Sequence, residues 1–169
     1  MYHTLCANPV SLLPMLRQQP HKVLMLTTAW GNMRLLALSC SEKKTDTPGR
    51  CPALYRYDGP AYRIIRKCIT QHGWPQDLDI FILSGKYGLI PSHVPIPWYD
   101  KRLDPSTVDR KSLSQEWARL VERGYDDIFV AMGAAYREVL GAIPPFATVA
   151  RGRIGQQGSQ LRSWLLGLY

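Results

Sequence analysis

The sequence predicts an α/β domain with three layers, α/β/α, around a mostly parallel four-stranded sheet. Short apolar runs alternate with segments of helical periodicity, as in folds built from strand–helix–strand units. The chain has 169 residues, 46% of them apolar and only 20% charged, which suits one folded domain and argues against disorder. We therefore expect a single domain over residues 1–169, in which residues 1–33 form a less certain N-terminal extension.

Four apolar runs are the predicted strands. Each is short and is followed by polar residues or glycine, which is typical of a buried parallel strand that continues into a loop. A further stretch, residues 22–27, is a candidate edge strand, with a helix also expected in the first 30 residues. The four strands are Leu35–Ser39, Asp79–Ser84, Asp127–Met132 and Phe146–Ala150.

Helical spacing predicts four helices. One begins at Pro60, a residue that is favoured in the first turn, and one covers 134–140. Another begins with a capping box formed by Ser112 and Gln115 and stops before Gly124. Ser159 is expected to cap the last helix, with Leu161, Trp164 and Leu165 facing inward, while Trp117 is a core residue of the Ser112 helix.

Two segments are expected to lack helices. Residues 40–59 form a long, basic loop, and loops of this length within compact domains are usually functional. Residues 91–97 contain three prolines and must be irregular or extended. In a parallel sheet, ligands bind beyond the carboxyl ends of the strands. The loops that begin at Cys40, Ser84, and Gly133 or Arg151 should therefore converge on one site.

The charge favours a polyanionic partner. Lys and Arg number 21 against 13 Asp and Glu, a net charge of +8, and the excess is concentrated in residues 34–67 and 137–169. A surface that joins these segments would suit DNA, although an ordinary solvated surface is the alternative. No apolar run approaches the roughly 18 residues needed to cross a bilayer, and the N-terminus does not look like a signal peptide. We expect a cytoplasmic protein without a membrane partner or an obligate protein partner.

The four cysteines, at positions 6, 40, 51 and 68, form no C-x-x-C pair. This spacing argues against a zinc or iron–sulfur site, even with His72 as a possible further ligand. We expect reduced thiols and neither a metal nor an organic cofactor.

Two segments near the end of the chain, Ile128–Tyr136 and Arg151–Gly155, resemble parts of the uracil-DNA glycosylase superfamily. Ile128–Tyr136 is similar to the late strand of that family, and Arg151–Gly155 to its Arg-Gly-x-x-Gly segment. Leu35–Glu42 occupies the place of the water-activating loop, so the similarity spans residues 34–169. The chain departs from the family by having Ser39–Glu42 in place of Gly-Gln-Asp-Pro, and Ala147–Ala150 in place of the His-Pro-Ser segment. Catalytic residues are therefore not carried over.

The middle of the chain has a Cys-Ser-x-Lys-Lys loop at Cys40–Lys44, a Leu-Ser-x-Lys-Tyr-Gly-Leu strand end at Leu83–Leu89 and the pair Tyr99-Asp100. These segments resemble a bacterial and phage family, and the chain also resembles a small phage-defence DNA glycosylase that acts on glucosylated hydroxymethylcytosine. The resemblance implies a hydrolase that flips a modified base out of DNA, removes it and leaves an abasic site, in antiviral defence.

Cleavage of the base–sugar bond requires a carboxylate that activates water and stabilises an oxocarbenium-like state. Asp100 is the leading candidate because it ends a proline-framed loop beside two aromatic residues, and Glu42 is the second. The alternatives are a turn cap for Asp100 and a solvated ion pair for Glu42. Asp46 could also serve, and Ser41 is a further catalytic candidate. Attack by a lysine (Lys43, Lys44 or Lys86) to form a Schiff base stays open.

A flipped base needs stacking and edge contacts, and the strand needs cations against its phosphates. Any aromatic candidate for stacking could equally be a core or rim residue. The base-binding candidates are Cys40, Tyr87, Gly88, Trp98 and Tyr99, and the DNA-binding candidates are Lys43, Lys44, Arg50, Lys86, Arg102, Arg151 and Arg153.

Two other functions remain open at this stage. A non-catalytic DNA-binding module would need the basic surface but no carboxylate in the site. A nucleoside or nucleotide hydrolase or transferase would act on free monomers and would show little dependence on salt.

Overall fold

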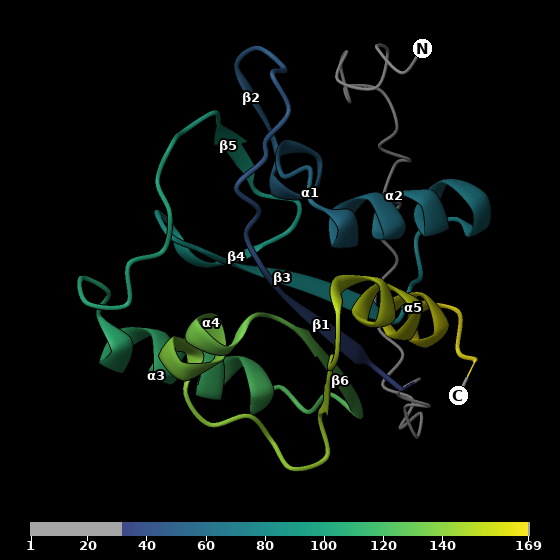
Figure 1. Cartoon of the computed structure of the whole chain (residues 1–169). Helices are drawn as coiled ribbons and strands as arrows, with labels where there is room; N and C mark the ends of the chain where they lie inside the picture. Colours follow the sequence, from purple (N-terminus) through teal and green to yellow (C-terminus); the bar gives the residue numbers. More distant parts are fainter. Residues whose placement is uncertain (1–31, 169) are drawn as a thin grey trace, which may run out of the picture. The chain divides into compact units, whose positions relative to one another are not determined.

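A computed structural model describes residues 32–168 and shows a five-stranded sheet in the order β4-β3-β1-β6-β7 (Figure 1). The candidate strand at residues 22–27 and most of the expected N-terminal extension lie outside the described residues. Four strands run parallel, whereas β4 is antiparallel to β3 at one edge. The strands are β1 (Arg34–Ser39), β3 (Leu78–Ser84), β4 (Gly88–Pro91), β6 (Asp127–Ala131) and β7 (Thr148–Val149).

The prediction of a four-stranded sheet was wrong, because the sheet has five strands. All four predicted runs contain a parallel strand, but β4 adds a fifth, because the chain reverses directly after β3 and pairs Ser84 with Gly88. Gly88 has a φ of 69°, a conformation that glycine adopts without the steric cost of a side chain. The reversal therefore depends on a position that the sequence analysis had assigned to base binding.

The segment 40–59, which we expected to lack regular structure, contains a strand and a short helix. β2 (Arg50–Pro52) pairs with β5 (Pro95–Pro97) in a separate two-stranded sheet, and α1 (Ala53–Arg56) follows β2. The prolines are tolerated because a two-stranded sheet consists of edge strands, which do not need every backbone donor. The central pair, Cys51 and Ile96, is buried and ties this small sheet to the core.

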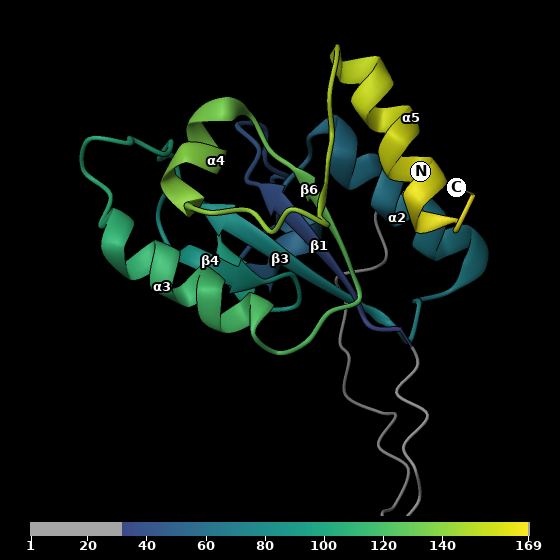
Figure 2. The ribbon, with the colours of Figure 1, turned by 90° about the horizontal axis from the view of Figure 1, so that it is seen from below.

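Helices cover both faces of the main sheet, which confirms the three-layer architecture (Figure 2). Leu36 and Leu38 of β1 pack on the side of α2 (Pro60–His72) and α5 (Ile154–Leu165). Leu35 and Ala37 pack on the side of α3 (Arg110–Val121) and α4 (Ala134–Leu140). The buried tryptophans follow the prediction: Trp117 belongs to the second core and Trp164 to the first.

Two predicted helix starts were wrong. α3 is capped by Asp109, whose Oδ1 accepts the backbone amide of Ser112 at 3.0 Å, so Ser112 already lies inside the first turn. α5 begins at Ile154, five residues before Ser159, and its glycines are helical. Gly158 lies where α5 approaches α2, because an added Cβ would stand 3.0 Å from the Ile64 side chain. Close helix packing thus overrides the low helix propensity of glycine.

No helix among residues 32–168 is both long enough and apolar enough to cross a membrane.

Candidate functional site

The carboxyl ends of the four parallel strands lie along one edge of the sheet. Ser39 pairs with Leu83, Leu38 pairs with Ala131, and β7 continues the same direction beside β6. The loops that follow these strands begin at Cys40, Gly85, Met132 and Ala150. All of the loops predicted to form the site therefore start at this edge, which is where open α/β sheets bind ligands.

A buried group of three hydroxyls, which we name the hydroxyl cluster, lies at the end of β3. It consists of Ser84, Tyr99 and Tyr57. The Tyr99 hydroxyl shares one hydrogen bond with Ser84 Oγ at 2.8 Å and another with the Tyr57 hydroxyl at 2.5 Å. Ser84 Oγ also accepts the backbone amides of Lys86 and Tyr87, at 3.1 and 3.2 Å. One serine thus fixes both the turn after β3 and the segment that contains Tyr99.

Aromatic rings surround the hydroxyl cluster. The ring of Tyr87 meets that of Tyr99 edge to face at 5.2 Å between centroids, and Tyr62 lies 5.3 Å from Tyr57. Burial raises the pKa of Tyr57, Tyr62 and Tyr99 above the usual value of a phenol. These hydroxyls are therefore neutral near pH 7 and act as hydrogen-bonding groups rather than as phenolates.

Two lysines lie against the ring of Tyr99. Lys44 Nζ is 4.6 Å from the ring centroid, and Lys86 Nζ is 5.4 Å from the centroids of both Tyr99 and Tyr87. A bridge between Lys44 and Tyr57 places the first lysine, and the Ser84 turn places the second. The aromatic faces attract these cations and hold positive charge at the carboxyl edge of the sheet.

Cys40, the first residue after β1, contacts α4. Its Sγ lies 3.3 Å from the hydroxyl of Tyr136. Desolvation first, and then the contact with Cys40, raises the pKa of the Tyr136 hydroxyl, so this group is also neutral. Within residues 32–168, no group of three His, Cys, Asp or Glu side chains is arranged to hold a metal ion.

The two leading carboxylate candidates differ in their surroundings. Glu42 is exposed and forms an ion pair with the equally exposed Arg102. Asp100 is also exposed, but it makes no hydrogen bond or ion pair with any described residue. The backbone at Arg102 and Leu103 passes directly over Gly85, where an added Cβ would lie 2.3 Å from the Leu103 nitrogen. The segment that contains Asp100 is thus packed tightly on the turn after β3.

Trp98 lies beside an open hollow of about 460 Å³ next to the two-stranded sheet. The indole is 55% exposed, whereas the next residue, Tyr99, is buried in the hydroxyl cluster. Arg50, another predicted DNA-binding residue, also lines the hollow and donates to the Pro95 carbonyl at 2.7 Å. The lining residues are Asp46, Thr47, Pro48, Gly49, Arg50, Pro97 and Trp98.

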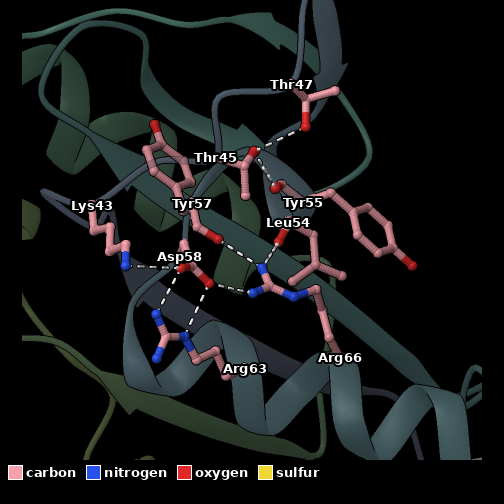
Figure 3. A network of polar contacts seen from close by, with 9 residues as sticks. All are labelled: Lys43, Thr45, Thr47, Leu54, Tyr55, Tyr57, Asp58, Arg63 and Arg66. Carbon is pink, nitrogen blue, oxygen red and sulfur yellow. Dashed lines mark hydrogen bonds and ion pairs between the residues drawn. The ribbon is translucent and has the colours of Figure 1, made fainter. Parts of the chain in front are cut away.

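A polar network centred on Asp58 fixes the start of α2 (Figure 3). Its carboxylate accepts from Arg63 and Arg66, each at 2.7 Å, and Lys43 Nζ lies 3.8 Å away. Arg66 also donates to the carbonyls of Leu54 and Tyr57. The hydrogen bond from Arg63 is the main cause that lowers the pKa of Asp58 to about 2. Lys43 therefore takes part in a structural network, in addition to being a predicted DNA contact.

The structure brings together only part of the predicted site. Cys40, Lys44, Lys86, Tyr87 and Tyr99 lie in or beside the hydroxyl cluster, and Trp98 with Arg50 lies at the hollow. Gly88 is the first residue of β4. Ser41 packs against Gly59, because a Cβ added to Gly59 would lie 2.9 Å from the Oγ of Ser41. Arg151 and Arg153 are exposed at the start of α5, but no contact joins their side chains to the hydroxyl cluster among the described residues.

Sequence reasoning missed three polar residues of the site. Ser84 is the last residue of β3 and belongs to the segment Leu83–Leu89, so its place at the end of a strand could have identified it as a site residue. Tyr57 and Tyr136 carry no local signal, because they reach the site through contacts with residues 42 and 96 positions away.

Comparison with known proteins gives one match. No curated protein and no solved structure matched the chain. The model of a protein family of unknown function, DUF6884, matches residues 35–163, a range that includes the five strands except the first residue of β1, the hydroxyl cluster and the hollow. The chain therefore belongs to the family DUF6884.

Proposed function

We propose that the protein is a DNA glycosylase that hydrolyses the bond between deoxyribose and a modified base and leaves an abasic site. The observation that carries the proposal is the placement of Asp100, an exposed carboxylate without a partner among the described residues. It directly follows Tyr99, which is hydrogen-bonded to the end of β3 and lies against two lysines.

The groups present suit the charges that develop during base removal. Water adds to C1′ of the sugar as the C1′–N bond breaks, and the bonding electron pair leaves with the base. Asp100 would take the proton of the attacking water and stabilise the positive charge on the sugar. Lys44 and Lys86, which lie against the Tyr99 ring, would bind the phosphates beside that sugar, and the departing base would take a proton from solvent.

Asp100 is preferred to Glu42 because Glu42 is already paired with Arg102. A base catalyst needs a carboxylate oxygen that water can reach, and the guanidinium of Arg102 already occupies Oε1 of Glu42. As an ion pair, Glu42 and Arg102 would support the loop after β1 rather than take part in the cleavage of the base–sugar bond. Arg102, free to exchange this partner for a phosphate, can still contact DNA.

DNA as the partner is supported by the net charge of +8 and by exposed cations in the loops of the carboxyl edge. The resemblance of Ile128–Tyr136 and Arg151–Gly155 to the uracil-DNA glycosylase superfamily supports both the reaction and a fold of that kind. The resemblance of the chain to a small phage-defence DNA glycosylase supports a modified base as the target. Antiviral defence and a cytoplasmic location are part of the same proposal.

The test is release of free base. The protein is incubated with phage DNA that contains modified bases and, in parallel, with unmodified DNA, and the small-molecule fraction is analysed by mass spectrometry. We expect a modified base from the first sample only. DNA binding without release from any substrate would favour a non-catalytic DNA-binding module, and release from free nucleosides alone would favour an enzyme of monomers.

A further inference from the structure

We infer that the hollow beside Trp98 holds a nucleobase that is unstacked from its neighbours, and that the protein consequently binds single-stranded DNA more tightly than duplex DNA. The inference rests on the proposed function in taking DNA as the partner. It adds a base-binding position and a strand preference. The hollow, at about 460 Å³, lies within the usual size range of small-molecule sites.

The walls of the hollow suit a planar base. Trp98 offers an exposed aromatic face, on which any base can stack. Pro48 and Pro97 add rigid apolar surface, while Arg50 and Asp46 supply a donor and an acceptor for the edge of the base. Among the described residues, Asp46 makes no ion pair or hydrogen bond, so its carboxylate is available to accept from an exocyclic amino group.

One wall of the hollow is held by a buried arginine. Arg56 is fully buried, and it donates to the carbonyls of Thr45 and Thr47 at 2.8 Å each and to that of Gly49 at 2.7 Å. It has no carboxylate partner within residues 32–168. Burying an unpaired charge is costly, and here the cation is offset only by these three carbonyls. The arrangement fixes the 45–49 segment, so the hollow exists before any ligand binds.

The position of the hollow links base binding to the proposed chemistry. Trp98 and Asp100 are two residues apart, so their Cα atoms lie within about 7.6 Å of each other. A base stacked on the indole would therefore keep its sugar close to the carboxylate. In a duplex the faces of a base are covered by its neighbours, so occupation of the hollow requires unstacking, which costs more in a duplex than in a single strand.

The experiment measures binding of labelled, unmodified oligonucleotides by fluorescence anisotropy, with the full chain and at one salt concentration. A single strand is compared with the same sequence as a duplex and with a strand in which the bases are replaced by abasic sites. The variants are Trp98→Ala, Trp98→Phe and Trp74→Ala. Trp74 is the matched control because it is 42% exposed, lies outside the hollow and follows α2.

We expect the unaltered protein to bind the single strand more tightly than the duplex or the abasic strand. Trp98→Ala should weaken single-strand binding about tenfold, in line with the loss of one stacked base, and should leave duplex binding nearly unchanged. Trp98→Phe should keep most of the affinity, and Trp74→Ala all of it. A thermal melt of each variant confirms that it is folded.

Equal affinity of Trp98→Ala and the unaltered protein for the single strand would overturn the inference, as would duplex binding as tight as single-strand binding. If base release from DNA persists in either case, the proposed function stands and only the hollow is wrongly assigned. If the protein binds no DNA in any form, the inference and the proposed DNA partner fail together.

Discussion

The hydroxyl of Tyr99 lies 2.8 Å from Ser84 Oγ, so the last residue of a central strand holds the loop segment that contains both Trp98 and Asp100. Trp98 and Asp100 are exposed on either side of a buried tyrosine. The two residues proposed to be functional are thus supported by the rigid sheet rather than by a free loop. Such support is what an active site needs in order to hold reacting groups in place.

Replacing Tyr99 by Phe should destabilise the protein through the hydroxyl cluster. The substitution removes the partner of Ser84 and Tyr57, and Tyr57 is left with a buried hydroxyl that has lost its hydrogen bond to Tyr99. We expect the free energy of unfolding to fall by about 1–2 kcal/mol. The corresponding fall in Tm, measured by calorimetry, is roughly 2–8 °C for a chain of this size.

The control for this prediction is Tyr87→Phe. The Tyr87 ring touches the same Tyr99 ring, but its hydroxyl makes no hydrogen bond with any described residue. Tyr87→Phe should therefore leave Tm within about 1 °C, as surface-like changes do. Equal Tm values for Tyr99→Phe and the unaltered protein would show that the hydroxyl cluster contributes nothing to stability.

The lysines beside Tyr99 should contact phosphates. Lys44→Gln and Lys86→Gln should each weaken DNA binding, and each should reduce the slope of log K against log salt by about 0.7–0.9. Lys111→Gln is the control, because Lys111 is exposed on α3, on the other face of the sheet. The slopes come from titrations at several salt concentrations. A slope that is unchanged in both Lys44→Gln and Lys86→Gln would remove these residues from the interface.

The Asp58 network should make stability depend on acid pH. The folded pKa of Asp58, about 2, lies below its ordinary value of 3.8 because Arg63 and Arg66 bind the charged form. A lowered pKa gives stability that is fully present above about pH 4 and is lost as the pH falls towards 2. The difference in unfolding free energy between the unaltered protein and Asp58→Asn, measured with urea, should therefore shrink over this range.

Asp46→Asn is the control for the pH experiment, because Asp46 forms no ion pair among the described residues. Its difference from the unaltered protein should be small throughout. If the effect of Asp58→Asn is the same at pH 5 and pH 2.5, the network does not act through the charge of Asp58.

Loss of the Arg56 guanidinium should make the wall of the hollow more mobile. Arg56→Met removes three hydrogen bonds to the 45–49 segment and should speed hydrogen exchange of the Thr45 amide, which donates to the Arg56 carbonyl at 2.8 Å. Amides of β1 should exchange as before, since they lie outside this segment. Unaltered exchange at residue 45 would mean that Arg56 does not order the segment.

Much of the fold could be predicted from the sequence, because periodicity reports burial directly. The apolar runs gave the four parallel strands, and the stripe of Leu161 and Trp164 gave the inward face of α5. The fifth strand was missed because β4 is short and follows a turn of three residues, and the two-stranded sheet because β2 and β5 contain prolines. Their pairing is decided by tertiary contacts rather than by local preference.

The site was harder to predict than the fold. Residues at the ends of strands, such as Cys40 and Lys86, could be found from the rule that ligands bind at the carboxyl ends. Tyr57 could not be found in this way, because only the folding of the chain brings its hydroxyl to that of Tyr99. The partners of Glu42 and Asp58 also depend on long-range ion pairs, which no local pattern of the sequence reveals.

The most direct test of the account counts abasic sites in modified phage DNA after incubation with the unaltered protein, with Asp100→Asn and with Glu42→Gln. A carboxylate that acts as a base contributes a factor of about 10²–10⁴ to the rate. We predict that Asp100→Asn forms abasic sites at least 100-fold more slowly while it binds the DNA as before, and that Glu42→Gln keeps most of its activity. Equal rates for Asp100→Asn and the unaltered protein would contradict the assignment of Asp100, and the absence of abasic sites in every sample would contradict the proposed reaction.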